Sequence, residues 1–258
     1  MSEENTTTDA VAETDAEAAN RSTSGYHMGA VDTVISVEDV NKQAKAMAEV
    51  IPVERIAELA GNDPFLRIDN LKAGYGKMEI LHDFNLQVAK GQSLCLIGPN
   101  GAGKSTILHS IFGFTNIFSG NILVGDGDKK TDVTAMTSSQ KLKHGGIAYI
   151  LQDKSIFPGM TVEENLWMGG YLMDTPDQAK EAAERVFAKY DRLAARRTHA
   201  AGVLSGGERR LLEISRALVM GPEVLLVDEP SIGLEPRFID MVFEILDDLQ
   251  HAEGKTII

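Results

Sequence analysis

The sequence predicts an α/β domain in which a mostly parallel β-sheet is flanked by helices. Two short apolar runs, at residues 94–97 and 224–227, have the composition of strands that are buried on both faces of a parallel sheet. Segments with helical spacing alternate with such runs, and a glycine-rich segment directly follows the first run. Strands that alternate with helices are typical of parallel sheets covered on both sides.

The other expected elements come from the same patterns of apolar residues. Further strands are expected at residues 65–68 and 85–88, and helices at residues 105–112, 177–190, 208–220 and 237–250. Cys95 lies in the predicted strand 94–97 and is interpreted as a small buried hydrophobe. The histidines at 82, 109, 144 and 199 lack the spacing of a metal site and are interpreted as solvated or capping residues.

Composition and charge limit the function classes that the chain could serve. The chain has 258 residues and a net charge of −13, of which residues 1–64 carry −9. This charge does not favour nucleic acid as a partner, and a single cysteine excludes an internal disulfide. No secretory leader and no apolar run of about 18 residues is visible. We therefore expect a cytoplasmic chain whose partners supply any membrane spans.

The first 64 residues differ in texture from the rest and are expected to form an acidic extension. Residues 1–30 contain few apolar side chains, so we expect a disordered tail there. Apolar residues recur at helical spacing over residues 36–60 and are interrupted at Pro52, which predicts one or two short amphipathic helices. These helices either dock on their own domain or form only transiently, or they contact a partner. A break at residues 61–64 separates the extension from the α/β domain at 65–258.

The glycine-rich segment after the first apolar run matches G-x-x-x-x-G-K-[ST], the pattern of a phosphate-binding loop. Its glycines allow the backbone N–H groups to wrap around phosphate, and the following helix adds positive charge at its N-terminus. Lys104 is expected to reach the outer phosphates, and the hydroxyl of Ser105 to bind Mg²⁺, with Thr106 nearby. The nucleotide-binding residues predicted from this segment are Gly98, Pro99, Asn100, Gly101, Ala102, Gly103, Lys104, Ser105 and Thr106.

Two carboxylates follow the second apolar run. Ligands of open α/β sheets bind at the carboxyl ends of the strands, which is where Asp228 and Glu229 are expected. Asp228 is predicted to hold Mg²⁺ through water. Glu229 is predicted to act as the general base that activates water for attack on the γ-phosphate.

A second glycine motif lies between the phosphate loop and these carboxylates. It consists of Leu204, Ser205, Gly206, Gly207 and Glu208, and it begins a predicted helix for which Ser205 is a suitable N-cap. This segment resembles the signature motif of ABC-type ATPases. Together with the phosphate loop and the Asp-Glu pair, the resemblance covers about residues 65–258.

The resemblance implies further roles and a fuller architecture. Tyr75 would stack on adenine, and Gln152 would contact Mg²⁺ or the attacking water, while residues 231–235 would cross a dimer interface. The signature residues would close over ATP held by a second subunit. The implied fold is a P-loop ATPase cassette with an antiparallel β portion and a helical subdomain at about residues 153–215.

The C-terminal end of the chain departs from the family pattern. In the family, the last core strand leads to a switch residue, often histidine, that contacts the γ-phosphate. Here the chain stops at residues 255–258, in what resembles that strand, and His251 precedes it. We expect the cassette to be truncated before its switch loop.

Residues 155–170 resemble the second, shorter ATPase subunit of branched-chain amino-acid importers. The implied partners are a second ATPase subunit, two membrane permeases at whose cytoplasmic face the chain is peripheral, and a periplasmic or extracellular binding protein. Trp167 and Tyr171 lie where the family contacts the permease, and they are interpreted either as a coupling contact or as aromatic residues that pack within the helical subdomain. Gln152 replaces the Glu of many members, so a urea or amide importer and a lipopolysaccharide-export ATPase are alternatives. A soluble ABC ATPase in DNA repair or translation is an alternative of another class.

Overall fold

The computed structural model describes residues 58–151, 155–231 and 234–258. The predicted acidic tail and almost all of the predicted amphipathic segment lie outside these ranges, as does Gln152. Residues 58–60 at the start of the first range are helical, and Ala60 is buried.

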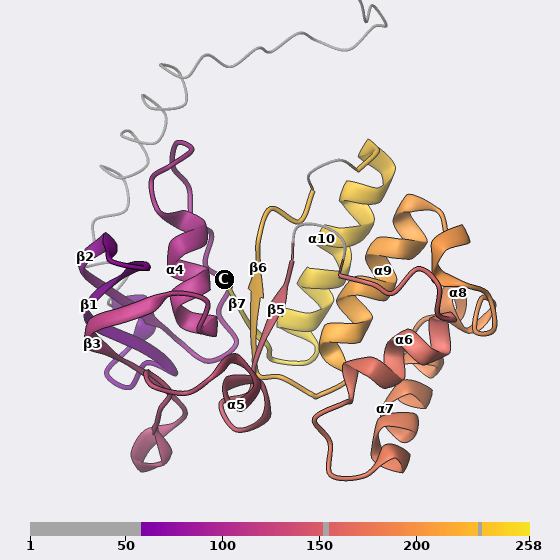
Figure 1. Cartoon of the computed structure of the whole chain (residues 1–258), viewed down its shortest axis with the longest axis horizontal. Helices are drawn as coiled ribbons and strands as arrows, with labels where there is room; N and C mark the ends of the chain where they lie inside the picture. Colours follow the sequence, from indigo (N-terminus) through magenta and orange to yellow (C-terminus); the bar gives the residue numbers. More distant parts are fainter. Residues whose placement is uncertain (1–57, 152–154, 232–233) are drawn as a thin grey trace, which may run out of the picture. The chain divides into compact units, whose positions relative to one another are not determined.

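Four strands form an antiparallel sheet in the order β2-β1-β3-β4 (Figure 1). Their bounds are β1 Leu66–Tyr75, β2 Met78–Val88, β3 Asn116–Val124 and β4 Thr131–Asp132. The strands predicted at 65–68 and 85–88 are the outer ends of a hairpin, which turns at Gly76 with a positive φ of 59°. The resemblance implied this antiparallel portion, whereas the apolar pattern alone did not predict β3.

A second sheet is parallel, in the order β5-β6-β7, with bounds Ile147–Ile150, Val224–Val227 and Thr256–Ile257. Side chains alternate between its two faces, as the period of a strand requires. Ile147, Val224 and Leu226 pack into the same cluster as the antiparallel sheet. Ala148 and Leu225 pack against helices on the other face. Burial on both faces explains why residues 224–227 read as an uninterrupted apolar run.

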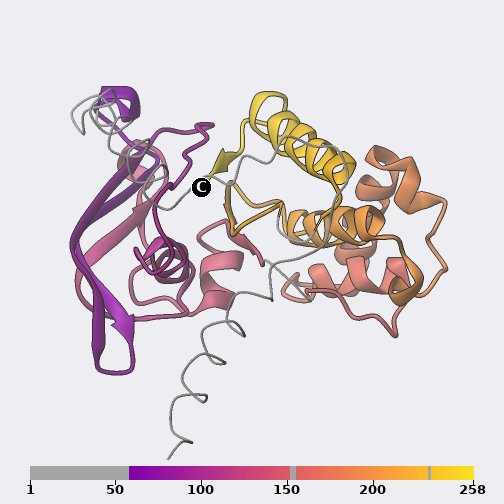
Figure 2. The ribbon, with the colours of Figure 1, turned by 90° about the horizontal axis from the view of Figure 1, so that it is seen from above.

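Helix α4, Lys104–Phe112, contacts strands of both sheets (Figure 2). Its buried residues Ile107, Leu108 and Ile111 belong to the cluster that includes β1, β3, β5 and β6. The phosphate loop therefore leads into a helix that is fixed on two sides.

The remaining helices begin close to the residues where their sequence predicts caps. Their bounds are α5 Ser138–Lys143, α6 Val162–Gly169, α7 Pro176–Lys189, α8 Asp191–Ala194, α9 Gly206–Leu218 and α10 Pro236–His251. Capping boxes begin four of these helices, with Thr137, Thr161, Thr175 and Ser205 as the N-cap residues. The three long helices predicted at 177–190, 208–220 and 237–250 are confirmed to within two residues.

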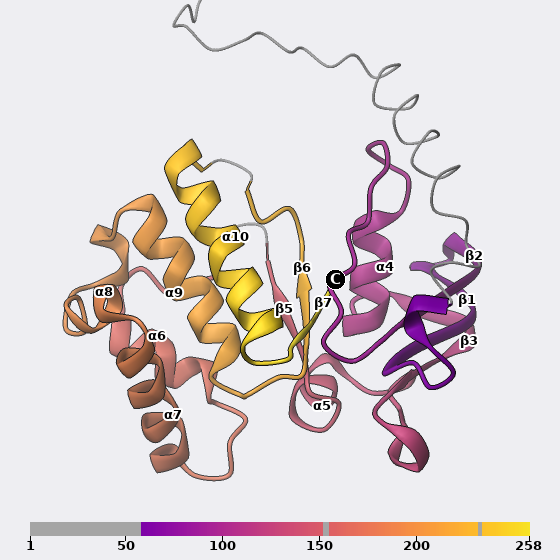
Figure 3. The same ribbon diagram turned by 180° about the vertical axis from the view of Figure 1, so that it is seen from behind.

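Helices α6 to α9 share a core of their own, which includes Leu166, Phe187, Leu193 and Leu212. These helices overlap the helical subdomain that is predicted at about residues 153–215. On its other face, α9 packs with α10 against the parallel sheet through Ile214, and Figure 3 shows these two helices beside β5 and β6.

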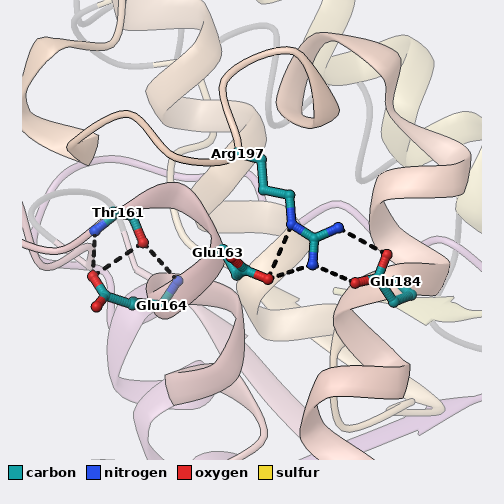
Figure 4. Close-up of polar contacts among 5 residues, drawn as sticks. All are labelled: Thr161, Glu163, Glu164, Glu184 and Arg197. Carbon is teal, nitrogen blue, oxygen red and sulfur yellow. Dashed lines mark hydrogen bonds and ion pairs between the residues drawn. The ribbon is translucent and has the colours of Figure 1, made fainter.

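A network of ion pairs connects helices α6 and α7 at the surface of this subdomain (Figure 4). The guanidinium of Arg197 donates hydrogen bonds to Glu163 near the start of α6 and to Glu184 in α7, with N–O distances of 3.0 Å to each. It also lies 4.7 Å from the ring centroid of Phe187. At the N-cap of α6, the Thr161 hydroxyl accepts a hydrogen bond from the Glu164 N–H at 3.1 Å. The network ties the segment after α8 to two helices at once.

The prediction for residues 94–97 is wrong, because this segment is not a regular strand and only one of its faces is covered. Ser93 forms an isolated bridge to Ile257, and the Leu94 N–H donates to the carbonyl of Ile257 at 2.8 Å. Leu94 and Leu96 pack on the core, but Cys95 is exposed and Ile97 is 63% exposed. Cys95 borders a cavity of about 830 Å³ and is not a buried hydrophobe. The apolar composition of residues 94–97 predicts burial on both faces, but neighbouring elements cover only one of them.

The C-terminal end of α4 is closed by a buried lysine. Lys141 is 0% exposed, and its ammonium donates to the carbonyls of Ser110 at 3.2 Å and Ile111 at 2.9 Å. A cation at this position satisfies carbonyls that a helix end leaves unpaired. Burial lowers the pKa of Lys141 to about 8, against a smaller opposing effect of the Asp132 charge.

This lowered pKa predicts a specific pH dependence of stability. Between about pH 8 and 10.5 the unfolded chain holds the Lys141 proton and the folded chain releases it, so the free energy of unfolding rises with pH. Relative to Lys141→Met, the original protein should gain about 1.4 kcal/mol per pH unit in this window. Denaturant unfolding at several pH values measures both slopes, and parallel slopes would show that Lys141 stays charged.

The two glycines at the start of α9 differ in what surrounds them. A Cβ at Gly206 would meet no atom within 4 Å, whereas a Cβ at Gly207 would lie 2.2 Å from Cδ1 of Phe238 in α10. Gly207 therefore allows α9 and α10 to approach closely, and Gly206 leaves the helix start open.

We expect Gly207→Ala to lower the free energy of unfolding by about 1–3 kcal/mol, because the methyl group overpacks against Phe238. The matched variant Gly206→Ala should change it by less than about 1 kcal/mol. Urea unfolding of both variants measures the difference. Adding Phe238→Leu to Gly207→Ala should recover part of the loss, and equal losses for the two alanine variants would contradict the packing argument.

Candidate functional site

The phosphate loop leaves the N-terminus of α4 without a side-chain cap. Gly103 is the N-cap residue, with a left-handed backbone at φ 89°, and Gly101 also has a positive φ of 83°. Residues other than glycine rarely adopt these angles, which accounts for the glycines at both positions. The first N–H groups of α4 are thus available to an anion.

Lys104 is folded back over the loop that precedes it. Its ammonium donates to the carbonyls of Gly98 at 2.8 Å and Pro99 at 3.0 Å. Phosphate oxygens placed in the loop would compete for the same ammonium, as the sequence prediction for Lys104 requires.

Ser105 and Asp228 come from distant parts of the chain and meet at the carboxyl end of β6. The hydroxyl of Ser105 donates to Oδ1 of Asp228 at 3.3 Å, and the hydroxyl of Tyr149 donates to Oδ2 at 3.0 Å. Burial, followed by the charge of Asp228, raises the pKa of Tyr149, so this hydroxyl remains a donor. Sequence reasoning missed Tyr149, because nothing in the run 147–150 points to a contact with Asp228.

A hydroxyl and a carboxylate are the hard oxygen ligands that suit Mg²⁺. Within residues 58–151, 155–231 and 234–258, no cluster of three or more His, Cys, Asp or Glu side chains is arranged to hold a metal. The oxygen pair of Ser105 and Asp228 fits a cation that Ser105 would bind directly and Asp228 would hold through water.

Glu229 directly follows Asp228 and has an unusual backbone. Its φ is 45°, in the left-handed region that side chains other than glycine, asparagine and aspartate seldom adopt. Glu229, Asp228 and Lys104 line the same 830 Å³ cavity. The structure thus brings together the predicted phosphate, metal and general-base residues. The sequence predicted the position of Glu229 but gave no sign of its strained backbone.

Tyr75 lies at the end of β1 and is 42% exposed, which leaves ring surface for stacking. Its hydroxyl shares a 2.5 Å hydrogen bond with Nδ1 of His109 in α4. His109 also contacts the rings of Phe114 and Tyr149 at centroid distances of 5.6 Å. The interpretation of His109 as a solvated or capping residue is wrong. Burial lowers its pKa, against a smaller opposing effect of Asp228, and keeps it a neutral member of an aromatic cluster.

The predicted signature residues lie at the start of α9, beside the core of the helical subdomain. Ser205 is the N-cap: its hydroxyl accepts from the Glu208 N–H at 3.3 Å, and the Glu208 carboxylate accepts from the Ser205 N–H at 2.9 Å. These bonds lower the pKa of Glu208, with a contribution from Arg196. Leu204 is buried in the subdomain core. Gly206 faces open space, as a site for a second subunit's nucleotide would require.

Two predicted sites cannot be placed completely. Gln152 and residues 232–233 lie outside the described ranges. Leu151, next to Gln152, is described, and its carbonyl accepts a 2.8 Å hydrogen bond from the buried guanidinium of Arg210 in α9. In the described part of the chain, every helix is too short or too polar to cross a bilayer.

The chain is similar to known proteins in family model, in sequence and in structure. A family model described as ABC transporter matches residues 81–232. BraG of Pseudomonas aeruginosa, a high-affinity branched-chain amino acid transport ATP-binding protein, is 40% identical over 74% of this chain and 79% of its own length. LptB of Haemophilus influenzae, a lipopolysaccharide export system ATP-binding protein, is 33% identical over 72% and 76%.

A solved ATP-binding cassette of an ABC transporter, in its ADP conformation, has a TM-score of 0.64 and 30% identity. The match covers 75% of this chain and 79% of that structure. The α/β cassette fold predicted from the sequence is confirmed, and the chain belongs to the ABC transporter family as an ATP-binding subunit.

Proposed function

We propose that this subunit binds and hydrolyses Mg-ATP to power the import of branched-chain amino acids or related small polar solutes. The observation that carries the ATPase part is the meeting of Lys104, Ser105, Asp228 and Glu229 beside the uncapped N-terminus of α4. The similarity to BraG supports the substrate class.

In the proposed mechanism, the loop N–H groups and Lys104 hold the β- and γ-phosphates of ATP. Ser105 and Asp228 would hold Mg²⁺, which would neutralise charge that develops on the phosphate oxygens. Glu229 accepts a proton from the attacking water. Tyr75 stacks on adenine. From the family resemblance, Gln152 is proposed to contact Mg²⁺ or the attacking water.

The signature residues Leu204–Glu208 are proposed to act on ATP held by a neighbouring ATPase subunit. The open space around Gly206 and the N-terminus of a 13-residue helix support this role. Two nucleotides would then be enclosed between two subunits, and hydrolysis would release the closed dimer.

An apolar groove supports contact with a membrane permease. It has a volume of about 430 Å³ and is lined by residues of the α4 end, β5 and α6, including Phe114, Phe157 and Met168. Tyr171, which also lines the groove, is 77% exposed, whereas Trp167 packs on the subdomain core. We therefore propose Tyr171 rather than Trp167 as the coupling contact, and place the subunit at the cytoplasmic face of the membrane, with a binding protein on the opposite side.

The alternative functions differ in the solute that is transported. The similarity to LptB favours lipopolysaccharide export as the second candidate, and a urea or amide importer remains consistent with Gln152. The assembled transporter with its binding protein should show leucine-stimulated ATPase activity if the import proposal holds. Stimulation by urea or acetamide alone would reassign the solute. Activity that no binding protein stimulates would favour export or a soluble ABC ATPase.

We predict that Glu229→Gln in the protein assembled with its partner subunits lowers steady-state ATPase activity by at least about 100-fold, because the general base is lost. ATP affinity should be retained, since the carboxamide keeps the shape of the side chain. The matched control is Glu223→Gln, at the opposite end of β6 on the surface. Undiminished phosphate release by Glu229→Gln would remove Glu229 from the role of base.

A further inference from the structure

The carboxylate of Asp228 has a separate hydroxyl donor on each oxygen. Ser105 donates to Oδ1, and Tyr149 donates to Oδ2 at 3.0 Å. Tyr149 lies on β5, whose residues pair with β6 in parallel register up to Ile150 and Val227. Asp228 follows that last pair, and its own N–H donates to the carbonyl of Ile150 at 3.3 Å. Both the backbone and the side chain of Asp228 are therefore held from β5.

The ring of Tyr149 is held by three aromatic neighbours. Phe112, His109 and Phe114 lie at centroid distances of 5.5, 5.6 and 5.7 Å from it. All three come from α4 or the turn that follows it. Because the ring is packed on this side, its hydroxyl has a fixed position relative to α4 and to Ser105 on the same helix.

The two donors are not equivalent once a cation binds. The Ser105 hydroxyl would bind the cation through a lone pair, and its 3.3 Å bond to Oδ1 uses the same hydroxyl oxygen. The bond from Tyr149 to Oδ2 is compatible with cation binding, because it uses the other oxygen. Partners that orient a metal ligand in this way affect metal affinity without touching the metal.

We propose that Tyr149 is a positioning residue for the Mg²⁺-binding carboxylate: its hydroxyl holds Oδ2 of Asp228, so that Oδ1 stays directed at the Ser105 side. The inference rests on the proposed roles of Ser105 and Asp228. Tyr149 is not itself a metal ligand in this arrangement, and its effect is on Mg²⁺ rather than on the nucleotide.

The test is Tyr149→Phe in the full chain, which removes the hydroxyl and retains the packed ring. Binding of fluorescent trinitrophenyl-ATP is titrated in EDTA and then across a range of MgCl₂ concentrations. The Mg²⁺ concentration for half-maximal effect should rise about tenfold, and affinity in EDTA should change less than about twofold. Mn²⁺ binding followed by electron paramagnetic resonance, with ATP present, should weaken to the same extent.

Tyr190→Phe is the matched control, because it makes the same chemical change in the core of the helical subdomain. It should leave both measurements unchanged. Equal shifts in EDTA and in MgCl₂ for Tyr149→Phe would indicate a general structural role and overturn the proposal, and so would the absence of any shift.

Asp228→Asn separates this inference from the proposed function. If the sites are assigned correctly, this variant loses the Mg²⁺ effect, and adding Tyr149→Phe to it produces no further shift. A Mg²⁺ effect retained by Asp228→Asn would remove Asp228 from the metal site and overturn both proposals. Loss of the effect in Asp228→Asn, with a normal response in Tyr149→Phe, would overturn the role of Tyr149 alone.

Discussion

The structure depends on one constraint: the apolar side chains of α4 must be buried while the N–H groups at its N-terminus stay available to a ligand. A side-chain cap would satisfy the first N–H groups and compete with phosphate, and the N-cap residue here is a glycine that offers none. The helix is instead stabilised along its length by packing on both sheets, and the ammonium of Lys141 satisfies carbonyls at its C-terminal end. Packing elsewhere thus stabilises an end that is left available for an anion.

This packing also fixes which site residues lie together. Ser105 and His109 are four residues apart on α4, so they share one face of the helix, one turn from each other. Ser105 contacts Asp228 and His109 contacts Tyr75. The same helix therefore positions the contacts proposed for Mg²⁺ and those proposed for adenine. A shift of α4 against the sheets would move Ser105 and His109 together.

The sequence predicted those features whose physical causes are local. The phosphate loop, the cap at Ser205 and the bounds of α7 and α10 depend on a few adjacent residues. The burial of residues 94–97 was predicted wrongly because it depends on what other elements place against each face. His109 was misread for a related reason, since its partner Tyr75 lies 34 residues away and its ring contacts form only in the fold. Tyr149 could not have been assigned, because its bond to Asp228 spans 79 residues.

The backbone of Glu229 connects these observations. Asp228 is held at its N–H and at both carboxylate oxygens. The change in chain direction after β6 therefore falls on the next residue. It does so at a φ of 45°, where a glycine would avoid a steric cost of about 1 kcal/mol or more. This sequence has a carboxylate at a position where the backbone favours glycine. The carboxylate of Asp228 is held beside Ser105, and Glu229 lines the same cavity as Asp228, which favours separate roles for the two acids at one phosphate site.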